Sequence, residues 1–343
     1  MAVIQNDQFE KSWIVSTQTT PLGVIPIIST SLSTQDIIGG WKTRWNIGRM
    51  NYKVPPGLYA IGTPDNNSPV LATANFKFTF DKIRTELRGL NLWLLVLDTK
   101  GINVWCAAGK GTFGTEELIF RMQEHKISKL VSHNKIILPQ LGAPGVSALK
   151  VTVATGFRVV YGPVRASDIP AFLSNGLKAT PAMRRVHFNL HDRLALAPVE
   201  LVTALKWIPL IALMLLVLKL ITGTYEMKNY VLDLIPFVAA IGAGTVIFPI
   251  LLPWLPGRAF AVRGWVLGSL VAAIASYWQG AGLTEWLVNF LWLSPLTAHF
   301  ALRFTGSTTF TSLSGVEKEV KIFYPVMALS ILIGLILVVI GTF

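Results

Sequence analysis

Cysteine and charged side chains are both scarce in this sequence, and each scarcity excludes a class of protein. Cys106 is the only cysteine among the 343 residues, so no disulfide can form within the chain. A zinc site built on several thiolates and an iron–sulfur cluster held by four cysteines are excluded for the same reason. Only 14% of the residues are charged, against about 25% in an average soluble protein. An ordinary water-soluble enzyme is therefore excluded as well.

The charges that are present lie mainly in the first part of the chain. Residues 1–200 contain 22 Lys and Arg and 13 Asp and Glu, which leaves 8 and 5 for residues 201–343. The second part instead holds five apolar stretches, each near the roughly 20 residues that cross a bilayer. They are expected at 204–223, 233–253, 262–280, 284–302 and 322–343. The sequence therefore predicts an all-α transmembrane domain over residues 204–343, with five spans in a lipid bilayer.

Lysine and arginine gather on one side of the predicted spans, and by the positive-inside rule that side is cytoplasmic. They precede the first span and lie between the second and third and between the fourth and fifth. These residues are Arg184, Arg185, Arg193, Lys206, Arg258, Arg263, Arg303, Lys318 and Lys321. The opposite side has only Lys219 and Lys228. We expect a multi-pass protein of the cytoplasmic membrane, with its N-terminal domain in the cytoplasm and Phe343 outside. Met1–Glu10 lacks the basic start and apolar core of a signal peptide.

The first 200 residues predict a soluble α/β domain at 51–182, which follows an irregular leader at 1–50. A basic juxtamembrane connector is expected at 183–203. Apolar runs with strand character alternate with helix-like stretches, and this alternation is typical of a mostly parallel sheet. The runs are Gly57–Ile61, Val70–Ala74, Leu92–Leu97, Ile136–Leu138 and Phe157–Tyr161, and the helix-like stretches are Phe80–Gly89, Thr115–His125 and Ser167–Ser174.

Ligands of such sheets bind on the loops that follow the carboxyl ends of the strands. The loop after Leu97 leads into the most informative segment, Asn103-Val104-Trp105-Cys106-Ala107-Ala108-Gly109-Lys110. A first interpretation is a dinucleotide site, because Gly109, Gly111 and Gly114 fit G-x-G-x-x-G. That motif requires an acidic residue about 20 positions later at the end of a second strand, and none is found there. A phosphate-binding P-loop also fails, because Val104 replaces its first glycine.

Two interpretations of Cys106 remain. Free cysteines are commonly buried as small apolar side chains. The alternative is a metal-bound thiolate, which Lys110 and a nearby helix N-terminus would favour over the thiol. A single sulfur cannot hold a bare metal ion tightly, but it can supply one axial ligand to a metal already held by a macrocycle.

The run Asn103–Lys110 resembles the cap-helix motif of the corrinoid protein of microbial mercury methylation. That family is related to the corrinoid-binding domain of the corrinoid iron–sulfur protein of the acetyl-CoA pathway. The resemblance extends over Pro56–Gly62, Ser68–Asn75, Leu95–Gly114, Lys135–Ala148 and Tyr161–Leu173, and the helical tail fits the same family. It implies a Rossmann-like α/β corrinoid-binding domain, followed by an all-α five-helix transmembrane domain.

The resemblance also implies a cofactor and the residues that hold it. The cofactor is a corrinoid of the cobalamin type, and Cys106 is the catalytic residue and the lower axial ligand of its cobalt, with the corrin's own nucleotide base displaced. The small-residue helix that approaches the macrocycle comprises Asn103, Val104, Trp105, Cys106, Ala107, Ala108, Gly109 and Lys110. Four residues on other loops are candidates to hold the corrin's amide edges, with polar turn residues as the alternative: Thr73, Asn75, Gln140 and Gly142.

The activity implied is transfer of a methyl group from cobalt to inorganic Hg(II), which gives methylmercury. An anionic thiolate opposite the methyl group would stabilise the Co(III) that remains when the methyl leaves with the bonding electrons. Transfer as a radical is the other route. Because this sequence has no iron–sulfur cluster, a ferredoxin-like protein with such clusters must supply electrons, and a methyl-donor protein of one-carbon metabolism must supply methyl groups. No nucleic-acid partner is expected.

Two other functions stay open at the level of sequence. One is a membrane-bound corrinoid methyl carrier of the acetyl-CoA pathway in one-carbon metabolism. The other is a transporter or sensor with a nucleotide-binding α/β domain.

Overall fold

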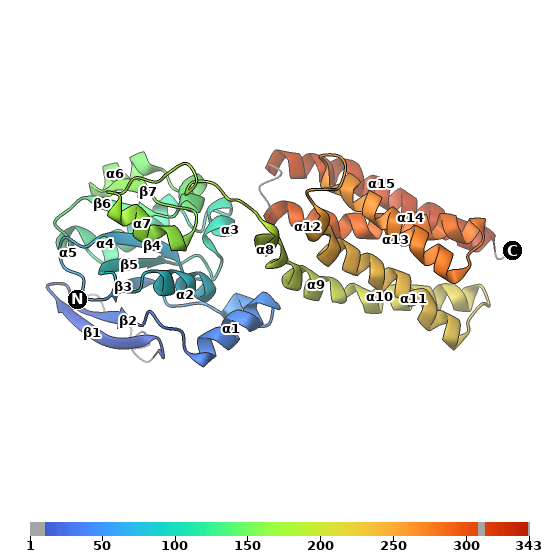
Figure 1. Ribbon diagram of the computed structural model, residues 1–343, viewed down its shortest axis with the longest axis horizontal. Coiled ribbons are helices and arrows are strands. Elements are labelled where there is room, and N and C mark those ends of the chain that lie inside the picture. Colours follow the sequence, from blue (N-terminus) through green and yellow to red (C-terminus); the bar gives the residue numbers. More distant parts are fainter. Residues whose placement is uncertain (1–10, 308–312, 342–343) are drawn as a thin grey trace. The chain divides into compact units, whose positions relative to one another are not determined.

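The computed structural model describes residues 11–307 and 313–341, and the chain divides into two compact units (Figure 1). The first unit consists of residues 1–43 and 47–186, and the second of residues 44–46 and 187–343. In the part of the chain that is described, the first unit holds all the strands, and the second is helical.

A mixed sheet of seven strands forms the centre of the first unit, in the order β1-β2-β3-β5-β4-β6-β7. The strands are β1 (Ile14–Thr20), β2 (Gly23–Ile28), β3 (Gly57–Ile61), β4 (Val70–Ala74), β5 (Leu92–Leu97), β6 (Lys135–Leu138) and β7 (Arg158–Tyr161). Strands β4, β5, β6 and β7 are parallel, whereas β3 is antiparallel to β5 and β1 to β2. The strands expected from the apolar runs are confirmed, and the parallel arrangement holds for these four strands.

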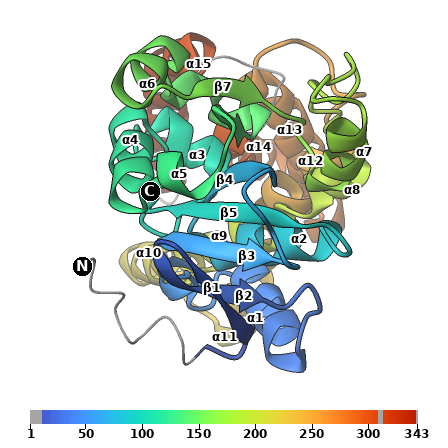
Figure 2. The same ribbon diagram turned by 90° about the vertical axis from the view of Figure 1, so that its left-hand side faces the viewer.

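Helices cover both faces of the sheet (Figure 2). Side chains of β5 alternate between the two cores: Leu92, Leu94 and Val96 face one, and Trp93, Leu95 and Leu97 face the other. The first core is closed by α2 (Lys77–Glu86) and α7 (Ile169–Ser174), and the second by α4 (Thr115–Glu124), α5 (Ile127–Leu130) and α6 (Ala148–Thr155). Because both faces are buried, β5 is an uninterrupted apolar run.

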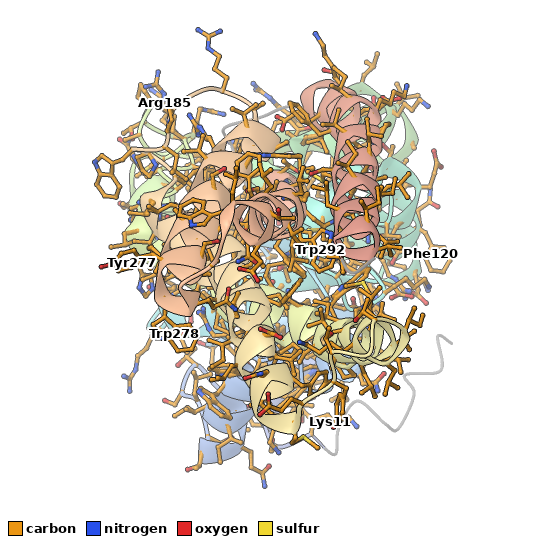
Figure 3. The ribbon with its side chains drawn as sticks, turned by 90° about the vertical axis from the view of Figure 1, so that its right-hand side faces the viewer. Lys11, Phe120, Arg185, Tyr277, Trp278 and Trp292 are labelled. Atoms are coloured by element: carbon orange, nitrogen blue, oxygen red, sulfur yellow. The ribbon has the colours of Figure 1, made fainter. Side chains whose placement is uncertain are left out.

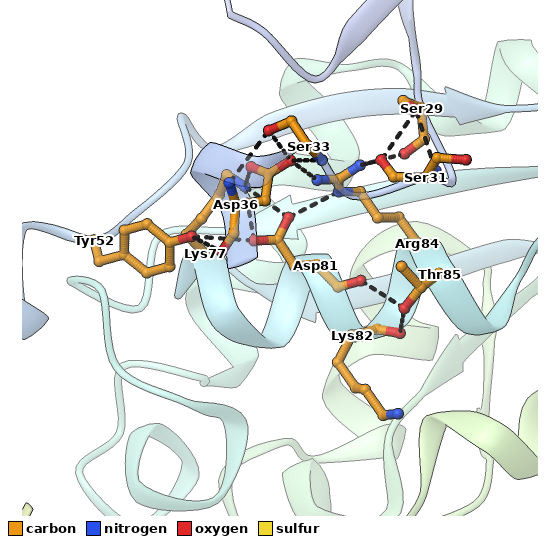
Figure 4. A network of polar contacts seen from close by, with 10 residues as sticks. All are labelled: Ser29, Ser31, Ser33, Asp36, Tyr52, Lys77, Asp81, Lys82, Arg84 and Thr85. Carbon is orange, nitrogen blue, oxygen red and sulfur yellow. Dashed lines mark hydrogen bonds and ion pairs between the residues drawn. The ribbon is translucent and has the colours of Figure 1, made fainter. Parts of the chain in front are cut away.

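The expectation of an irregular leader at 1–50 is wrong for residues 14–44, which form β1, β2 and α1 (Thr34–Arg44). Helix α1 is held by a buried ion network (Figure 4). The carboxylate of Asp36 accepts hydrogen bonds from Lys77 Nζ at 2.6 Å and from Arg84 Nη2 at 2.7 Å. The same two cations bond Asp81. The segment is therefore part of the α/β unit, tied to α2 by groups far away in the sequence.

The second unit is built from helices joined by short turns. They are α8 (Leu190–Leu194), α9 (Ala197–Leu205), α10 (Trp207–Ile221), α11 (Met227–Gly242), the π-helix η5 (Ala243–Ile247), α12 (Phe248–Leu251), α13 (Phe260–Gln279), α14 (Leu283–Arg303), the 3₁₀ turn η6 (Phe304–Ser307) and α15 (Leu313–Ile340). The connector expected at 183–203 is thus helical from Leu190 onward. This difference follows from the Asn189 cap, whose side chain accepts from the Asp192 nitrogen.

Four helices of the second unit are long and apolar enough to cross a membrane: Leu190–Ile221, Asn229–Leu251, Phe260–Gln279 and Ser314–Ile340. The five spans expected from the sequence are therefore not all confirmed, because α14 is not one of the four. Helix α14 carries polar side chains at Glu285, Asn289 and His299.

One face of α14 is packed inside the helical unit. It lies against α11, η5, α13 and α15, and ten of its residues are buried. Glycines let α13 approach it closely: a Cβ on Gly264 would lie 2.7 Å from the Ala298 Cα, and one on Gly268 would lie 2.6 Å from the Ser294 Cα. Small residues at such spacing are typical of helix pairs in membranes. The other helices therefore cover one face of α14, while Glu285 in its first turn is exposed and accepts a hydrogen bond from the Gly282 nitrogen.

Candidate functional site

The candidate site lies at the carboxyl edge of the parallel strands, on the loop that follows β5. Asn75, directly after β4, organises this loop. Its Oδ1 accepts hydrogen bonds from the backbone nitrogens of Thr99 and Gly101 at 3.1 and 2.9 Å, and its Nδ2 donates to Asp98 at 3.1 Å. The side chain is 1% exposed. Asn75 therefore fixes the path of the chain into the motif, with its amide oxygen occupied by this loop.

The motif forms a short helix, α3 (Val104–Gly109), capped by Asn103. The Oδ1 of Asn103 accepts a hydrogen bond from the backbone nitrogen of Cys106 at 2.9 Å. Such a cap satisfies one of the backbone N–H groups that the first helical turn leaves without a partner. The position of Cys106 in the helix is thus set by the residue three positions before it.

The two faces of α3 differ in exposure. Val104, Ala107 and Ala108 are buried in the core below, while Cys106, Gly109 and Lys110 form the outer face. Cys106 is a free, exposed cysteine, so the interpretation of this residue as a buried apolar side chain is wrong. Gly109 lies one turn after Cys106, and no atom lies within 4 Å of the Cβ that another residue would place there. The thiol therefore stands on an open surface, with a glycine one turn after it and Lys110 on the same face.

A second loop supports α3 from below. The 3₁₀ segment η3 (Gln140–Gly145) follows β6 and packs against α3. A Cβ on Gly142 would lie 2.5 Å from the Phe113 ring, and one on Gly145 would lie 2.2 Å from the Phe113 carbonyl oxygen. Phe113 is fully buried, and its nitrogen donates to the Ala107 oxygen at 3.1 Å. Gly142 therefore positions α3 through Phe113.

The other two loop candidates have separate surroundings. Thr73 is 0% exposed, and its Oγ1 has no hydrogen-bond partner. The Oε1 of Gln140 accepts a hydrogen bond from Arg184 Nη1 at 2.8 Å. The structure thus brings Gln140 and Gly142 to the loop beneath α3, whereas Thr73 and Asn75 lie at or just beyond the end of β4 inside the protein.

Sequence reasoning missed Phe113, Gly145 and Glu117. The only sequence signal for Phe113 is an aromatic residue among glycines, at Gly111-Thr112-Phe113-Gly114. Glu117 Oε1 accepts hydrogen bonds from the Asp98 nitrogen and from Arg121 Nε, both at 2.7 Å. This carboxylate therefore links α4 to the loop that precedes the motif.

Asp98 on the same loop is held in its charged form. Burial alone would raise its pKa, but hydrogen bonds from the Lys100 side chain and backbone and the charge of Lys100 lower the pKa below its ordinary value. The two side chains are 2.6 Å apart. A negative charge at Asp98 is therefore present at all physiological pH values.

A cavity of about 300 Å³ adjoins α3 on the side of the sheet covered by α2. Asn103, Val104 and Trp105 form one part of its wall, and Cys106 is not in the lining. The wall also includes Leu71, Ala72, Phe78, Thr79, Lys82, Ile83, Leu94, Ile137, Leu138, Pro139, Leu141, Gly162, Pro163, Val164, Ala166 and Ile169. Mostly apolar lining with a few polar groups is typical of small-molecule sites.

The arrangement disfavours the dinucleotide interpretation. In that motif the glycine-rich turn joins a strand directly to the following helix. Here α3 intervenes between β5 and the turn Gly109–Gly114.

In residues 11–307 and 313–341, no group of three or more His, Cys, Asp or Glu side chains is arranged to hold a metal ion. Within the described part of the chain, a metal at Cys106 would take its other ligands from a group that is not part of the protein.

The site is thus an exposed thiol at the ligand-binding edge of an α/β unit, and comparison with known proteins relates this unit to corrinoid protein subunits. Residues 41–173 match the family described as CO dehydrogenase/acetyl-CoA synthase delta subunit. The acetyl-CoA decarbonylase/synthase complex subunit gamma of Methanopyrus kandleri is 37% identical over 123 residues, which are 35% of this chain and 26% of that protein. The subunit of that name from Methanocaldococcus jannaschii is 39% identical over 124 residues, 36% of this chain and 25% of the relative.

The corrinoid/iron-sulfur protein large subunit of Moorella thermoacetica is 34% identical over 122 residues, which are 35% of this chain and 27% of that protein. The relation expected from the resemblance to the corrinoid iron–sulfur protein is therefore confirmed for the α/β unit. The chain spans about a quarter of the length of the curated relatives it matches.

Proposed function

We propose that this chain is a membrane-anchored corrinoid methyltransferase that passes a methyl group to inorganic Hg(II) and forms methylmercury. The observation that carries the proposal is the exposed Cys106 on α3, with Gly109 beside it. When bound, the corrinoid supplies cobalt that carries the methyl group and exchanges electrons. Similarity to a corrinoid/iron-sulfur protein supports a cofactor of this class.

The residues of α3 fit such a cofactor. Cys106 is free and exposed, so its thiolate would be available to hold the cobalt of the corrinoid. Gly109 leaves the surface next to the sulfur low enough for a flat ring to approach. Lys110 supplies a positive charge on the same face, and a positive charge near a cysteine favours its thiolate. Asn103, Ala107 and Ala108 hold the helix in place from its start and from its buried side.

The cavity beside Trp105 offers room for a second part of the cofactor. Its volume of about 300 Å³ and its apolar wall suit a flat aromatic group, such as a nucleotide base displaced from the cobalt. Lys82 and Asn103 in the wall can hydrogen-bond a polar tail. In this proposal Gln140 holds an amide edge of the corrin, and Thr73, Asn75 and Gly142 act by positioning the loops.

The helical unit is proposed as the anchor in the cytoplasmic membrane. Exposed aromatic side chains lie near both ends of α13. Trp254 comes before its start, and Tyr277 and Trp278 lie at its end (Figure 3). Tryptophan and tyrosine are enriched at both interfaces of a bilayer. Arg258 and Arg263, at the start of α13, mark the cytoplasmic side by the positive-inside rule. The C-terminus is then outside, although Phe343 itself lies beyond the described residues.

Two protein partners belong to this proposal. Because the sequence has a single cysteine, the chain cannot hold a four-cysteine iron–sulfur cluster. Electrons must come from a ferredoxin-like protein with such clusters, and methyl groups from a methyl-donor protein of one-carbon metabolism. The products of the assay at a controlled reduction potential would distinguish transfer of the methyl group as a carbanion from transfer as a radical.

The test uses the full chain, purified without oxygen and reconstituted in lipid with cobalamin. The wild type should bind the corrinoid with the absorption of a cobalt–sulfur bond and form methylmercury from Hg(II) with a reduced ferredoxin. Cys106→Ala should lose the spectrum and the product. Leu149→Ala, on α6 and 75% exposed, is the matched control and should keep both. Methylation that survives in Cys106→Ala would refute the role of the thiolate.

A second candidate is a membrane-bound corrinoid carrier of one-carbon metabolism in the acetyl-CoA pathway. It is favoured by the relatives, which are subunits of acetyl-CoA decarbonylase/synthase complexes. If this is the function, the reconstituted protein should pass its methyl group to an acetyl-CoA synthase faster than to Hg(II). The two acceptors can be compared in one competition assay. Binding of NAD or ATP in place of a corrinoid would instead select a nucleotide-binding transporter or sensor.

A further inference from the structure

Helix α1 buries its polar side and exposes its apolar side. Its inward stripe consists of Asp36, Gly40 and Thr43, which are buried. Its outward stripe consists of Ile37, Ile38 and Trp41, which are 60%, 47% and 58% exposed. A surface helix of a soluble protein normally buries its apolar stripe and exposes its polar one. The apolar side of α1 is therefore turned away from the core of its own unit.

The buried ion network fixes this orientation. Asp36 bonds both Lys77 and Arg84, and the Nζ of Lys77 lies 4.6 Å from the centre of the Trp13 ring. The side chain of Arg84 is 0% exposed. If α1 rolled so that its isoleucines faced inward, Lys77 and Arg84 would lose one of their two carboxylates inside the protein. Two buried cations would then share the single carboxylate of Asp81, which is destabilising, so the apolar stripe stays outside.

The exposed apolar surface continues past the end of the helix. Ile47 and Met50 are 55% and 61% exposed. We call the five residues Ile37, Ile38, Trp41, Ile47 and Met50 the α1 patch. Several large apolar side chains exposed within one short segment point to a site of contact with a protein or a membrane.

The charges around the α1 patch are almost all of one sign. Lys42, Arg44, Arg49 and Lys53 are basic, and Asp36 is the only acidic residue between Thr34 and Lys53. Because Asp36 belongs to the buried network, the exposed charged side chains of this segment are basic. A basic helix with an apolar face that contains tryptophan is the composition of segments that lie in the interface of an anionic bilayer.

We propose that the α1 patch is a second, peripheral membrane contact, in which Ile37, Ile38 and Trp41 enter the headgroup region of an anionic lipid surface. The basic residues around them pair with lipid phosphates. The contact restricts how the α/β unit is held at the membrane. This inference concerns α1 and needs no cofactor, but it does rest on the anchoring of the helical unit in a bilayer.

The test places a nitroxide label on the full chain in lipid nanodiscs. Ile38→Cys carries the label in a Cys106→Ala background. Leu149→Cys, on the α6 surface and 75% exposed, is the water-facing control, and Ile274→Cys, on α13 and 62% exposed, is the lipid-facing control. Oxygen partitions into bilayers, and a nickel chelate stays in water. In discs with phosphatidylglycerol, the ratio of spin relaxation by oxygen to relaxation by the nickel chelate should be higher for a label at residue 38 than for a label at residue 149.

Charge dependence separates anionic lipid from other apolar surroundings. Each basic residue near such a surface contributes about 1 kcal/mol, so Lys42→Gln should weaken the docking equilibrium about fivefold. Discs of phosphatidylcholine alone should weaken it further. Lys150→Gln on α6 is the matched control and should change nothing.

Three results would overturn the inference. If labels at residues 38 and 149 show the same oxygen-to-nickel ratio and the label at residue 274 lies in lipid, the α1 contact is refuted and the anchor is left intact. Exclusion of both reagents at 38 would show that protein, either a second copy or this chain itself, covers the patch. Water accessibility at 274 would refute the anchor, and the α1 contact with it.

Discussion

The side-chain oxygen of Asn103 lies 2.9 Å from the backbone nitrogen of Cys106 and accepts its hydrogen bond. The residue that begins α3 is thus bonded to the one that bears the thiol. In a helix of six residues, one cap is a large share of the local stabilisation.

The first prediction concerns this cap. Asn103→Ala should destabilise α3 by about 1 kcal/mol and loosen the position of the sulfur. Cobalamin should then bind more weakly and with a weaker cobalt–sulfur absorption, measured by titration of the full chain. Asn103→Ser restores a capping oxygen and should recover most of the affinity. Equal loss in both variants would mean that Asn103 acts on the ligand and not on the helix.

The second prediction uses two glycines to separate stability from binding. Gly142→Ala places a Cβ 2.5 Å from the buried Phe113 ring, and overpacking of this kind costs about 1–3 kcal/mol. Gly109→Ala meets no atom within 4 Å, so the free energy of unfolding should hold or rise slightly. Its added methyl group lies on the face of Cys106, however, and should weaken corrinoid binding. Unfolding in urea and cobalamin titration of both variants measure these effects. Normal binding by Gly109→Ala would contradict the proposed approach of a flat ring.

The third prediction concerns the ion network that holds α1. Arg84→Met leaves Asp36 and Asp81 to share Lys77 as the cation of the network inside the protein. Breaking a buried charge network in this way costs about 3–5 kcal/mol. Amide hydrogen exchange in α1 should therefore accelerate strongly. Lys82→Met on the same helix removes an exposed ion pair with Glu86 and should have little effect. Similar exchange in the two variants would contradict the network's role.

The fourth prediction is a pH dependence with a defined sign. Burial acts to raise the pKa of Asp36, but hydrogen bonds from Lys77 and Ser33 and the charge of Lys77 outweigh it and hold the pKa well below the ordinary 3.8. A carboxyl whose pKa is lowered by folding stabilises the folded protein fully at pH values above its ordinary pKa. That stabilisation is lost as the pH falls from the ordinary pKa toward the lower pKa of the folded state. Protection of α1 in hydrogen exchange should thus decrease below about pH 4, and Asp36→Asn should flatten the decrease. An unchanged slope in the variant would assign the effect to other carboxyls.

The fifth prediction tests the packing of α13 on α14. Gly268→Val places side-chain atoms where the Ser294 Cα would already be 2.6 Å from a Cβ. We expect a lower melting temperature of the full chain in detergent, because the two helices must separate. Gly242→Val is the control, since no atom lies within 4 Å of its Cβ position. Equal melting temperatures would mean that the close approach contributes nothing.

The central strands were predictable because burial on both faces makes them continuous apolar runs, as in Leu92–Leu97. β1 escaped prediction because its residues, Ile14–Thr20, are mostly polar and partly exposed. Helix α1 escaped for another reason: it shows its apolar side to the outside and is held from within by Asp36. The partners of Asp36 are 41 and 48 residues away, and no local pattern reveals them.

The candidate site also has one part that the sequence predicts and another that it does not. Cys106 and the small residues around it were predictable because they follow one another in the sequence. The support from Gly142 and Phe113 was not, because it depends on two loops that meet only after β4, β5 and β6 have paired. The position of Asn75 in the sequence likewise does not show that the Thr99–Gly101 turn occupies its amide oxygen.

The position of α14 also has a consequence for how the protein is made. Only the turn 280–282 separates α14 from α13, and its polar side chains make it a poor candidate to leave the translocation channel for lipid alone. Since its buried face is complementary to Gly264 and Gly268, we expect α13 and α14 to enter the bilayer together as a hairpin. A chain truncated within α14 would leave α13 without its partner. Quality-control proteases should therefore remove such products during synthesis.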